Sequence, residues 1–347
     1  MLRPTDAALR RLPKAELHVH LDGSLRPSTL AELARERERP LPVYDELALG
    51  AHMLVSDARN LEEYLARFAL TLSVMQDADA LERIAFELVE DHAAENVTYV
   101  EIRFCPGLNT EGGLTPDEVM DAVLAGAEAG QTATGTRARI IVCALRSLPP
   151  ASSIEMAEVA AAYVARGACA FDLAGAEKGF PARDHLEAFT VARRAGLPVT
   201  VHAGEGYGAP SLRQAVEDVE AERIGHGTRL IEDPELMAMV RDRGILLETC
   251  LTSNVQTRVA ASYADHPVRR YVEEGIAVTL CTDNRLMSGV TLTDEYGHAR
   301  DHSGLDAATL TALARAGFEH AFVSDGERDA LLAVFDQAVA GWDPSAG

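Results

Sequence analysis

Short runs of apolar, often β-branched residues recur along the chain, and amphipathic stretches separate most of them. Several runs are apolar on both faces, which is typical of strands buried in a parallel sheet. Eight such runs occur, at residues 15–21, 97–105, 137–145, 168–175, 197–204, 222–227, 244–252 and 276–283. The pattern therefore predicts eight strands that alternate with helices.

The stretches between these runs carry the end signals of α-helices. Residues 115–130 begin with a threonine, a proline and acidic residues, which favour a helix amino terminus. Residues 183–196 end in a basic turn and a glycine, which are typical of a carboxyl terminus. Eight strands that alternate with helices predict a (β/α)₈ barrel, also called a TIM barrel. A doubly wound open sheet is the rival fold, although no G-x-G-x-x-G motif opens a helix after a strand.

The interval between the first two predicted strands, about residues 22–96, is long and mostly helical in pattern. Residues 61–96 in particular carry apolar side chains at helical spacing. We expect these inserted helices after the first strand to cover the mouth of the barrel. Since no linker, repeat or low-complexity segment interrupts the chain, we expect residues 1–347 to form a single domain.

Composition narrows the range of partners. The 347 residues are 47% apolar, and 32 basic against 54 acidic residues give a net charge of −22. Such a surface repels nucleic acid and anionic lipid, and it suits a neutral or cationic small molecule. Five widely spaced cysteines indicate reduced thiols and a cytoplasmic protein rather than a disulfide framework. No run has the length of a signal peptide or a membrane helix, so no membrane partner is expected. The sequence makes no prediction about the oligomeric state.

Polar residues gather where the predicted strands end, and in a barrel these ends share the face that holds the active site. They are His18, His20, Asp22, Asp172, Gly175, His202, Glu205, His226, Ser253, Asn254, Asp283 and Asn284. His18 and His20 point the same way from one strand because they are two residues apart. An isolated H-x-H pair is more often structural, but His202 and Asp283 end two other strands. Three imidazoles and one carboxylate suit Zn²⁺ and leave room for water.

Two further residues at these ends have an acid–base interpretation. Glu205 follows His202 by three residues, and a carboxyl group shielded beside a metal can hold a raised pKa and deliver a proton. Its structural alternatives are to cap the helix that begins near Ser211 or to support a metal ligand from behind. His226 could hydrogen-bond a metal-bound water, and its alternative is a buried histidine bonded to a backbone carbonyl.

The remaining histidines are interpreted as structural. His298 and His302 are four residues apart on a predicted helix but lack the glutamate of H-E-x-x-H, which favours a solvated helix face. His185 and Glu187 form H-x-E without the P-C-x-x-C motif that cytidine-deaminase zinc sites need. No role is predicted for the others, which are His52, His92, His266 and His320.

The motifs PKAELHVHLDGSL, VTYVEIRFCP, DLAGAE, VHAGE, RIGHG, TSN and TDN follow one another in this chain. In this order the chain resembles the adenosine deaminases, a branch of the metal-dependent amidohydrolases, over about residues 10–340. The resemblance implies a (β/α)₈ barrel with one zinc ion per chain. Its ligands would be His18, His20, His202 and Asp283, and Glu205 matches the acid that protonates purine N1.

The same resemblance implies further site residues. His226 matches the histidine that orients and helps to deprotonate the zinc-bound water, and Asp283 also accepts that proton. Gly175 matches a glycine whose backbone N–H meets purine N3, and Asp22 matches a carboxylate that contacts the ribose 5′-hydroxyl. Asn284 stands where many members have aspartate, facing purine N7, to which an amide donates directly. His20 is also expected beside the substrate.

The implied activity is the hydrolysis of adenosine and 2′-deoxyadenosine to inosine, deoxyinosine and ammonia in purine salvage. The alternative is another 6-aminopurine, such as aminodeoxyfutalosine or adenine, although the short side chain of Asp22 leaves space for a sugar. A binuclear amidohydrolase would commonly use a carboxylated lysine at the end of the fourth strand, and Lys178 lies beyond it. A non-catalytic barrel is disfavoured because the ligands, the acid and the base are all present.

Overall fold

The computed structural model describes residues 2–55 and 61–347, and within them eight strands form one sheet in the order β1 to β8. Each strand pairs in parallel with the next along the chain. The strands are β1 (Lys14–His20), β2 (Val97–Phe104), β3 (Arg137–Leu145), β4 (Ala168–Ala174), β5 (Val199–Ala203), β6 (Arg223–His226), β7 (Leu246–Thr249) and β8 (Val278–Leu280). Seven of them lie inside the apolar runs predicted from the sequence, and β1 begins one residue before its run.

The first and last strands meet and close the sheet. Val19 forms a parallel bridge with Asp283. The Asp283 N–H donates to the carbonyl of His18 at 2.8 Å, and the His20 N–H donates to the carbonyl of Asp283 at 2.7 Å. These bonds confirm the predicted (β/α)₈ barrel, because an open doubly wound sheet would leave both edges unpaired.

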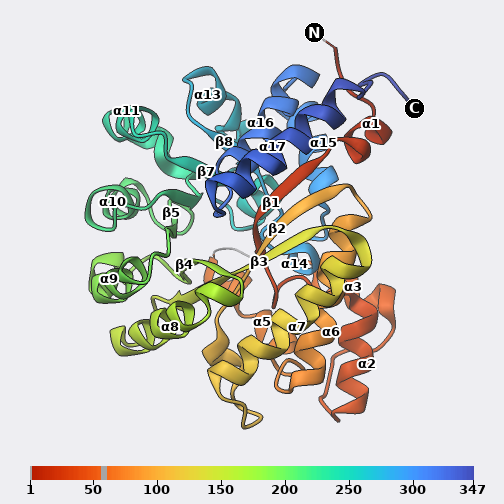
Figure 1. The fold of residues 1–347 in the computed structure, drawn as a ribbon, viewed down its shortest axis with the longest axis vertical. Coiled ribbons are helices and arrows are strands. Elements are labelled where there is room, and N and C mark those ends of the chain that lie inside the picture. Colours follow the sequence, from red (N-terminus) through yellow and green to blue (C-terminus); the bar gives the residue numbers. More distant parts are fainter. Residues whose placement is uncertain (1, 56–60) are drawn as a thin grey trace.

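Amphipathic helices surround the barrel (Figure 1). The connecting helices after β2 are α7 (Pro116–Thr134), α8 (Pro150–Ala162), α9 (Leu186–Arg194), α10 (Ala209–Arg213), α11 (Pro234–Asp242), α12 (Leu251–Gln256), α13 (Val268–Glu273), α14 (Arg285–Ser288), α15 (Leu292–His302) and α16 (Ala307–Glu319). Residues that favour helix ends in the sequence are found at the ends of these helices. Thr115 and Glu118 form a capping box at the start of α7, and Asp233 caps α11.

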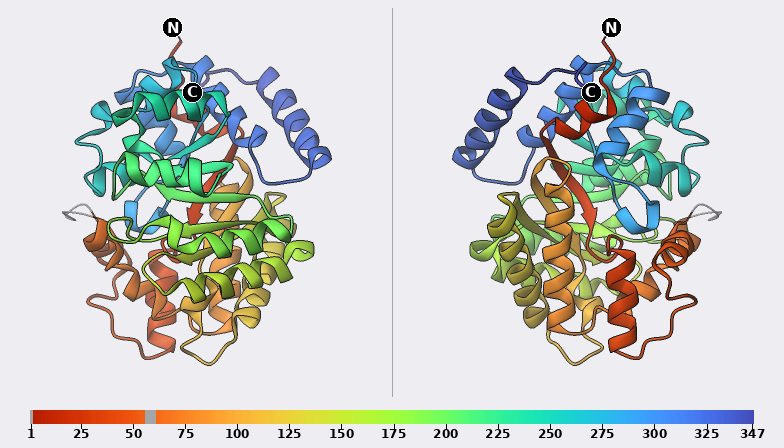
Figure 2. Two further views of the ribbon diagram at one scale, coloured as in Figure 1. Left: turned by 90° about the vertical axis from the view of Figure 1, so that its left-hand side faces the viewer. Right: turned by 90° about the vertical axis from the view of Figure 1, so that its right-hand side faces the viewer.

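The insertion between β1 and β2 is helical, as its pattern predicts. It contains α2 (Pro27–Glu36), α3 (Glu46–Met53), α4 (Leu61–Leu65), α5 (Phe68–Leu72) and α6 (Ala78–Ala93), while residues 56–60 lie outside the described residues. In both views of Figure 2 this part of the chain, coloured red to orange, gathers in the lower half of the molecule. Helices α4 and α5 line the cavity at the carboxyl ends of the strands, so the insertion covers the barrel mouth.

The two ends of the chain lie side by side on the barrel (Figures 1 and 2). Thr5, which caps α1 (Asp6–Arg11), donates its N–H to the carbonyl of Pro344 at 3.0 Å. The indole N–H of Trp342, beyond α17 (Asp325–Ala340), donates to the carbonyl of Ala8 at 2.8 Å. Among the described helices, none has both the length and the apolar character that a membrane crossing requires.

Candidate active site

Four histidines and one aspartate converge at the carboxyl ends of β1, β5, β6 and β8. One ligand atom each from His18, His202, His226 and Asp283 lies within 4.8 Å of the others. His20 belongs to the same group, since its Nε2 is 3.1 Å from His202 Nε2 and 3.4 Å from Asp283 Oδ1. These five residues are called the histidine layer below.

Backbone conformation helps to gather this layer. His226 and Asp283 have φ angles of +66° and +62°, in the left-handed region that residues other than glycine rarely adopt. Such strain is typical of functional sites, where the surrounding structure holds it in place. Gly225 contributes through its missing side chain, because an added Cβ would lie 2.8 Å from Cε1 of His18. The glycine in RIGHG therefore leaves room for a ring that comes from a different strand.

The protonation states of three of the four histidines in this layer suit a metal ion, whereas Asp283 and Glu248 raise the pKa of His18 despite its burial. Burial lowers the pKa of His20, His202 and His226, so these imidazoles are neutral, as metal ligands must be. Burial opposes ionisation of Asp283, but the closely placed imidazoles of His18, His226 and His20 outweigh it and lower the pKa of that carboxyl. His18 Nε2 is buried and has no hydrogen-bond partner. A buried, unpaired nitrogen beside other nitrogen donors and a carboxylate fits a metal ion with N and O ligands.

A set of buried charges supports the ligand histidines from below. Glu248 Oε2 lies 2.8 Å from His18 Nδ1, and Asp172 Oδ2 lies 3.0 Å from His202 Nδ1. Arg103 joins the two carboxylates, at 2.7 Å from Glu248 and 3.2 Å from Asp172. A carboxylate on the outer nitrogen of a ligand histidine fixes both its tautomer and its orientation.

The network continues away from the site. Arg223 lies 2.7 Å from Glu248 and 2.5 Å from Glu101, and all of these side chains are buried. The paired-charge layer is defined as Glu101, Arg103, Asp172, Arg223 and Glu248. Sequence reasoning noted Asp172 but missed the other four. Their signal was present, because each is a charged residue inside a run otherwise apolar enough for a buried strand.

The site opens into a cavity of about 320 Å³, a size suited to a small molecule. Eight of the nine residues predicted for the site line it: His20, Asp22, Gly175, His202, Glu205, His226, Asp283 and Asn284. The ninth, His18, is fully buried and packs against the rings of His20, His202 and His226. The opposite wall is apolar and includes Leu61, Tyr64 and Phe68 of the insertion. No lysine or arginine is among the described residues that line this cavity.

Glu205 faces this cavity as a carboxyl group that favours its protonated form. Burial, together with the charges of Asp283 and Glu177, raises its pKa well above the usual range. Its Oε2 lies 3.6 Å from His226 Nε2. The alternative role as a helix cap is wrong, because α10 begins at Ala209 without a side-chain cap.

Two further polar residues that line the cavity, Asp22 and Asn284, have unpaired side-chain oxygens. Asp22 Oδ1 and Asn284 Oδ1 are buried without a hydrogen-bond partner, and burial raises the pKa of Asp22 to about 7. Gly23 is needed next to them, since an added Cβ would lie 1.7 Å from Asn284 Oδ1. Gly175 has a φ of +94° and brings its backbone to the cavity wall.

His226 is held by a side-chain network rather than by a backbone carbonyl. Its Nδ1 lies 3.1 Å from Nδ2 of Asn254. Asn254 Oδ1 accepts from the Thr228 hydroxyl at 2.6 Å and lies 3.0 Å from His266 Nε2. These contacts orient the amide so that its NH₂ group faces His226. Sequence reasoning gave no role to His266, whose partners come from other parts of the chain.

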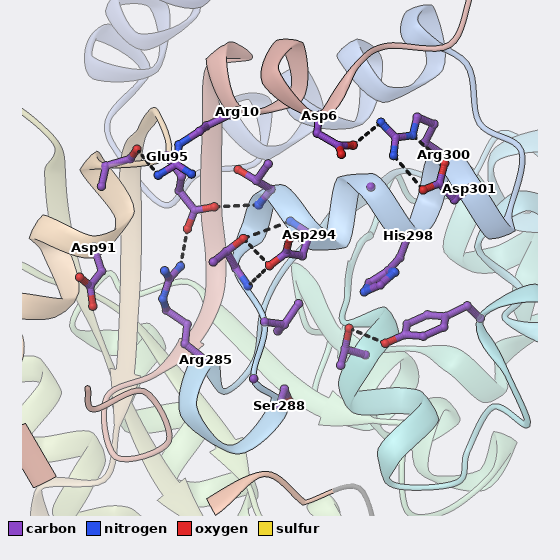
Figure 3. Close-up of a pocket in the computed structure, with 18 of the residues that line it drawn as sticks. Asp6, Arg10, Asp91, Glu95, Arg285, Ser288, Asp294, His298, Arg300 and Asp301 are labelled. Carbon is purple, nitrogen blue, oxygen red and sulfur yellow. Dashed lines mark hydrogen bonds and ion pairs between the residues drawn. The ribbon is translucent and has the colours of Figure 1, made fainter. Parts of the chain in front are cut away.

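A larger surface cavity, of about 1090 Å³, lies elsewhere and is lined by charges that pair with one another (Figure 3). Arg285 pairs with Glu95, and Arg300 pairs with Asp6 at 2.6 Å. His298, on its wall, stacks on Tyr263 with ring centroids 4.2 Å apart. His302 is exposed, as the predicted solvated helix face requires, whereas His298 is half-buried against Tyr263.

A closed (β/α)₈ barrel with a buried cluster of histidines and a carboxylate at its strand ends defines a metal-dependent hydrolase of the amidohydrolase type. The chain belongs to the adenosine deaminase family, since the family model described as Adenosine deaminase matches residues 13–338. An adenosine deaminase of Mycobacteroides abscessus is 42% identical over 350 residues, which cover 96% of this chain and 95% of that protein.

Solved structures agree with the fold across the whole barrel. An adenine deaminase from Arthrobacter aurescens matches with a TM-score of 0.86 and 25% identity over 95% of this chain and 99% of its own. An N6-methyl-AMP deaminase from Arabidopsis thaliana matches with a TM-score of 0.85 and 30% identity, over 97% and 99%. An amidohydrolase from Burkholderia ambifaria with bound zinc matches with a TM-score of 0.86 and 26% identity, over 96% and 93%.

Proposed function

We propose that this protein hydrolyses adenosine and 2′-deoxyadenosine to inosine, deoxyinosine and ammonia, using one zinc ion per chain. One observation carries the proposal. Inside a cavity of about 320 Å³, a carboxyl group with a strongly raised pKa, Glu205, faces a cluster of neutral imidazoles and an ionised carboxylate. This is the arrangement that water addition to a purine needs, and the chain belongs to the adenosine deaminase family.

Four residues would hold the metal: His18, His20, His202 and Asp283. His20 is favoured over His226 because it points the same way as His18 from β1 and its Nε2 lies within 3.4 Å of both His202 and Asp283. The zinc seen in the Burkholderia structure supports the choice of ion. When bound, zinc supplies the Lewis acidity that makes water a nucleophile at neutral pH.

The remaining side chains move protons. Water adds to C6 of the purine, Asp283 accepts a proton from it, and Glu205 delivers a proton to N1. Because Asn254 donates to His226 Nδ1, the neutral ring of His226 carries its proton on Nε2. His226 therefore orients the attacking oxygen by donating to it, a narrower role than the shared deprotonation expected from the sequence. Asp283 then returns its proton to the 6-amino group, which leaves as ammonia, and loss of the 6-hydroxyl proton to Glu205 restores the acid and gives the 6-oxopurine.

The cavity favours a nucleoside over a nucleotide or a free base. Asp22 places an unpaired carboxyl oxygen at the wall, where it can accept a hydrogen bond from a ribose hydroxyl. The same group would repel a phosphate, and no lysine or arginine among the described lining residues compensates it. Gly175 and Asn284 would contact the purine at N3 and N7. The structural relatives that act on adenine or N6-methyl-AMP mark the alternatives.

The test is a substrate panel of adenosine, 2′-deoxyadenosine, adenine, AMP and aminodeoxyfutalosine, followed by loss of adenine absorbance on a sample of known zinc content. We expect adenosine and deoxyadenosine to give the highest kcat/KM. Glu205→Gln should lower kcat by about 10²–10⁴-fold, the usual contribution of a general acid, while zinc stays bound. Rapid turnover of aminodeoxyfutalosine with almost none of adenosine would overturn the substrate assignment.

We further propose that residues 1–347 act as one domain in the cytoplasm, with no nucleic acid or membrane partner. One hydrophobic cluster includes side chains from α1 to α17. All five cysteines are free and buried, which suits a reducing compartment.

A further inference from the structure

Glu177 is the last residue of the DLAGAE motif and has no role in the mechanism above. It follows β4, and the residue is 3% exposed. Oε2 accepts the N–H of Gly204 at 3.0 Å, and Oε1 accepts the N–H groups of Glu205 and Gly206, both at 2.7 Å. One side chain thus satisfies three consecutive backbone donors on another loop.

These three donors form a concave anion site of the kind called a nest. Gly204 has a φ of +76°, a conformation that glycine adopts at low cost and that turns the chain directly after β5. The chain's own carboxylate fills the nest, so the loop is shaped around a negative charge. Loss of that charge would leave these N–H groups unpaired, which disfavours this conformation of the loop.

The loop held in this way carries two of the groups at the reacting centre. His202 and Glu205 lie on the five-residue segment 202–206. At its start, the buried Arg146 donates from Nη2 to the carbonyl of His202 at 2.5 Å. Its far end is held by Glu177. His202 is therefore fixed by Arg146 and Asp172, whereas the backbone of Glu205 depends on Glu177.

We propose that Glu177 is a positioning residue for the deamination, and that it sets the position of Glu205 relative to His202 without touching the substrate. The inference rests on the proposed function only in taking Glu205 as the proton donor. A displacement of about 1 Å at a reacting group can cost about 10²-fold in rate. Loss of Glu177 should therefore lower kcat while KM and zinc content stay near their wild-type values.

The experiment compares Glu177→Gln and Glu177→Ala with matched variants at Glu222. Glu222 accepts the N–H of Val199 at 2.9 Å, at the opposite end of the same strand. The glutamine at position 177 keeps one acceptor oxygen for Glu205 and Gly206 but turns an NH₂ group toward Gly204. We expect kcat to fall about 10²-fold in the alanine variant and about 10-fold in the glutamine variant. Both Glu222 variants should keep the wild-type kcat.

Two readouts separate positioning from general stability. Added formate should raise the kcat of Glu177→Ala by refilling the nest, and it should leave Glu222→Ala unchanged. Amide hydrogen exchange without substrate should speed up at residues 204–206 in the Glu177 variants only. Wild-type turnover in the same assay tests the proposed function separately, because the inference concerns the ratio of variant to wild type.

Three outcomes would overturn the inference. The first is a wild-type kcat in Glu177→Ala at equal zinc content. The second is a loss of kcat that parallels a loss of zinc. The third is the absence of a formate response together with unchanged exchange at residues 204–206.

Discussion

Two layers of buried charged and titratable groups lie one below the other in this barrel, and their bonding differs. In the paired-charge layer, each side chain meets an opposite charge, as Arg103 does with Asp172 and Glu248. In the histidine layer, one carboxylate stands among four imidazoles, and His18 Nε2 is buried without a partner. The first layer pairs its charges within itself, whereas the second leaves a nitrogen that could bind a metal ion unpaired.

The difference shows how a ligand-binding site can be distinguished from a purely structural set of buried charges in the same core. Burial alone does not separate the two layers, because nearly all of their side chains are inaccessible. Charge pairing does, since every carboxylate and guanidinium of the paired-charge layer has an opposite charge within 3.2 Å, even though the Nε atoms of Arg103 and Arg223 have no hydrogen-bond partner. Orphan atoms gather again at the far side of the cavity, at Asp22 and Asn284. The unpaired atom of His18 thus marks a possible metal position, and those of Asp22 and Asn284 mark a place for a polar substrate.

The largest expected effect is loss of activity when the histidine layer is broken. His20→Ala should lower kcat/KM by at least about 10³-fold, because Lewis-acid assistance is worth several kcal/mol. Its metal content should fall as well. The metal-free variant should unfold within about 1 kcal/mol of metal-free wild type, since the side-chain partners of His20 are His202 and Asp283 of the histidine layer. Enzyme assays, metal analysis and denaturant unfolding of the stripped proteins measure all three quantities.

Zinc addition supplies the control for this prediction. Stripped wild-type protein should regain activity when zinc is returned, and stripped His20→Ala should not. A variant that kept both its zinc and its activity would show that His226, rather than His20, completes the ligand set.

In the paired-charge layer, a substitution should mainly lower the free energy of unfolding. Arg103→Met leaves two buried carboxylates without their cation, and breaking a buried pair in this way costs about 3–5 kcal/mol. Denaturant unfolding measures this loss. The matched control is Arg26→Met, which also removes an arginine from two carboxylates, Glu90 and Asp91, but at the surface. That change should cost at most about 1 kcal/mol. Equal losses in the two variants would contradict the distinction between the layers.

The sequence predicted the histidine layer better than the layer below it, for a physical reason. His18, His20, His202 and Asp283 lie at strand ends, and in a parallel barrel all such ends share one face. Their proximity therefore follows from the fold class alone. Arg103 and Glu248 lie inside strands, where contact depends on the register and tilt of strands far apart in the sequence.

Local conformation and long-range side-chain contacts were also beyond the sequence pattern. The left-handed backbone at His226 and Asp283 has only a weak signal in residue type, because aspartate and histidine adopt it more often than most residues but still rarely. His266 meets Asn254 through the packing of the loop after α12. The eight strands and the inserted helices were predictable because hydrophobic periodicity is a local property.

The smallest expected effect concerns the ion pair between Glu95 and Arg285, which lies outside the barrel on the wall of the cavity in Figure 3. Burial opposes ionisation of Glu95, but Arg285 outweighs it, and the pKa of Glu95 falls to about 2. A lowered carboxyl pKa gives stability that is fully present above the unfolded value, near 4.5, and is lost as the pH falls toward 2. Between these pH values, the unfolding free energy of the wild type should therefore rise with pH more steeply than that of Glu95→Gln. The two slopes should differ by at most about 1.4 kcal/mol per pH unit, which corresponds to one proton. Denaturant unfolding from pH 5 to about 2 measures this difference, and Glu90→Gln, at an exposed pair, is the control. An unchanged slope in Glu95→Gln would mean that Arg285 does not hold the carboxylate ionised.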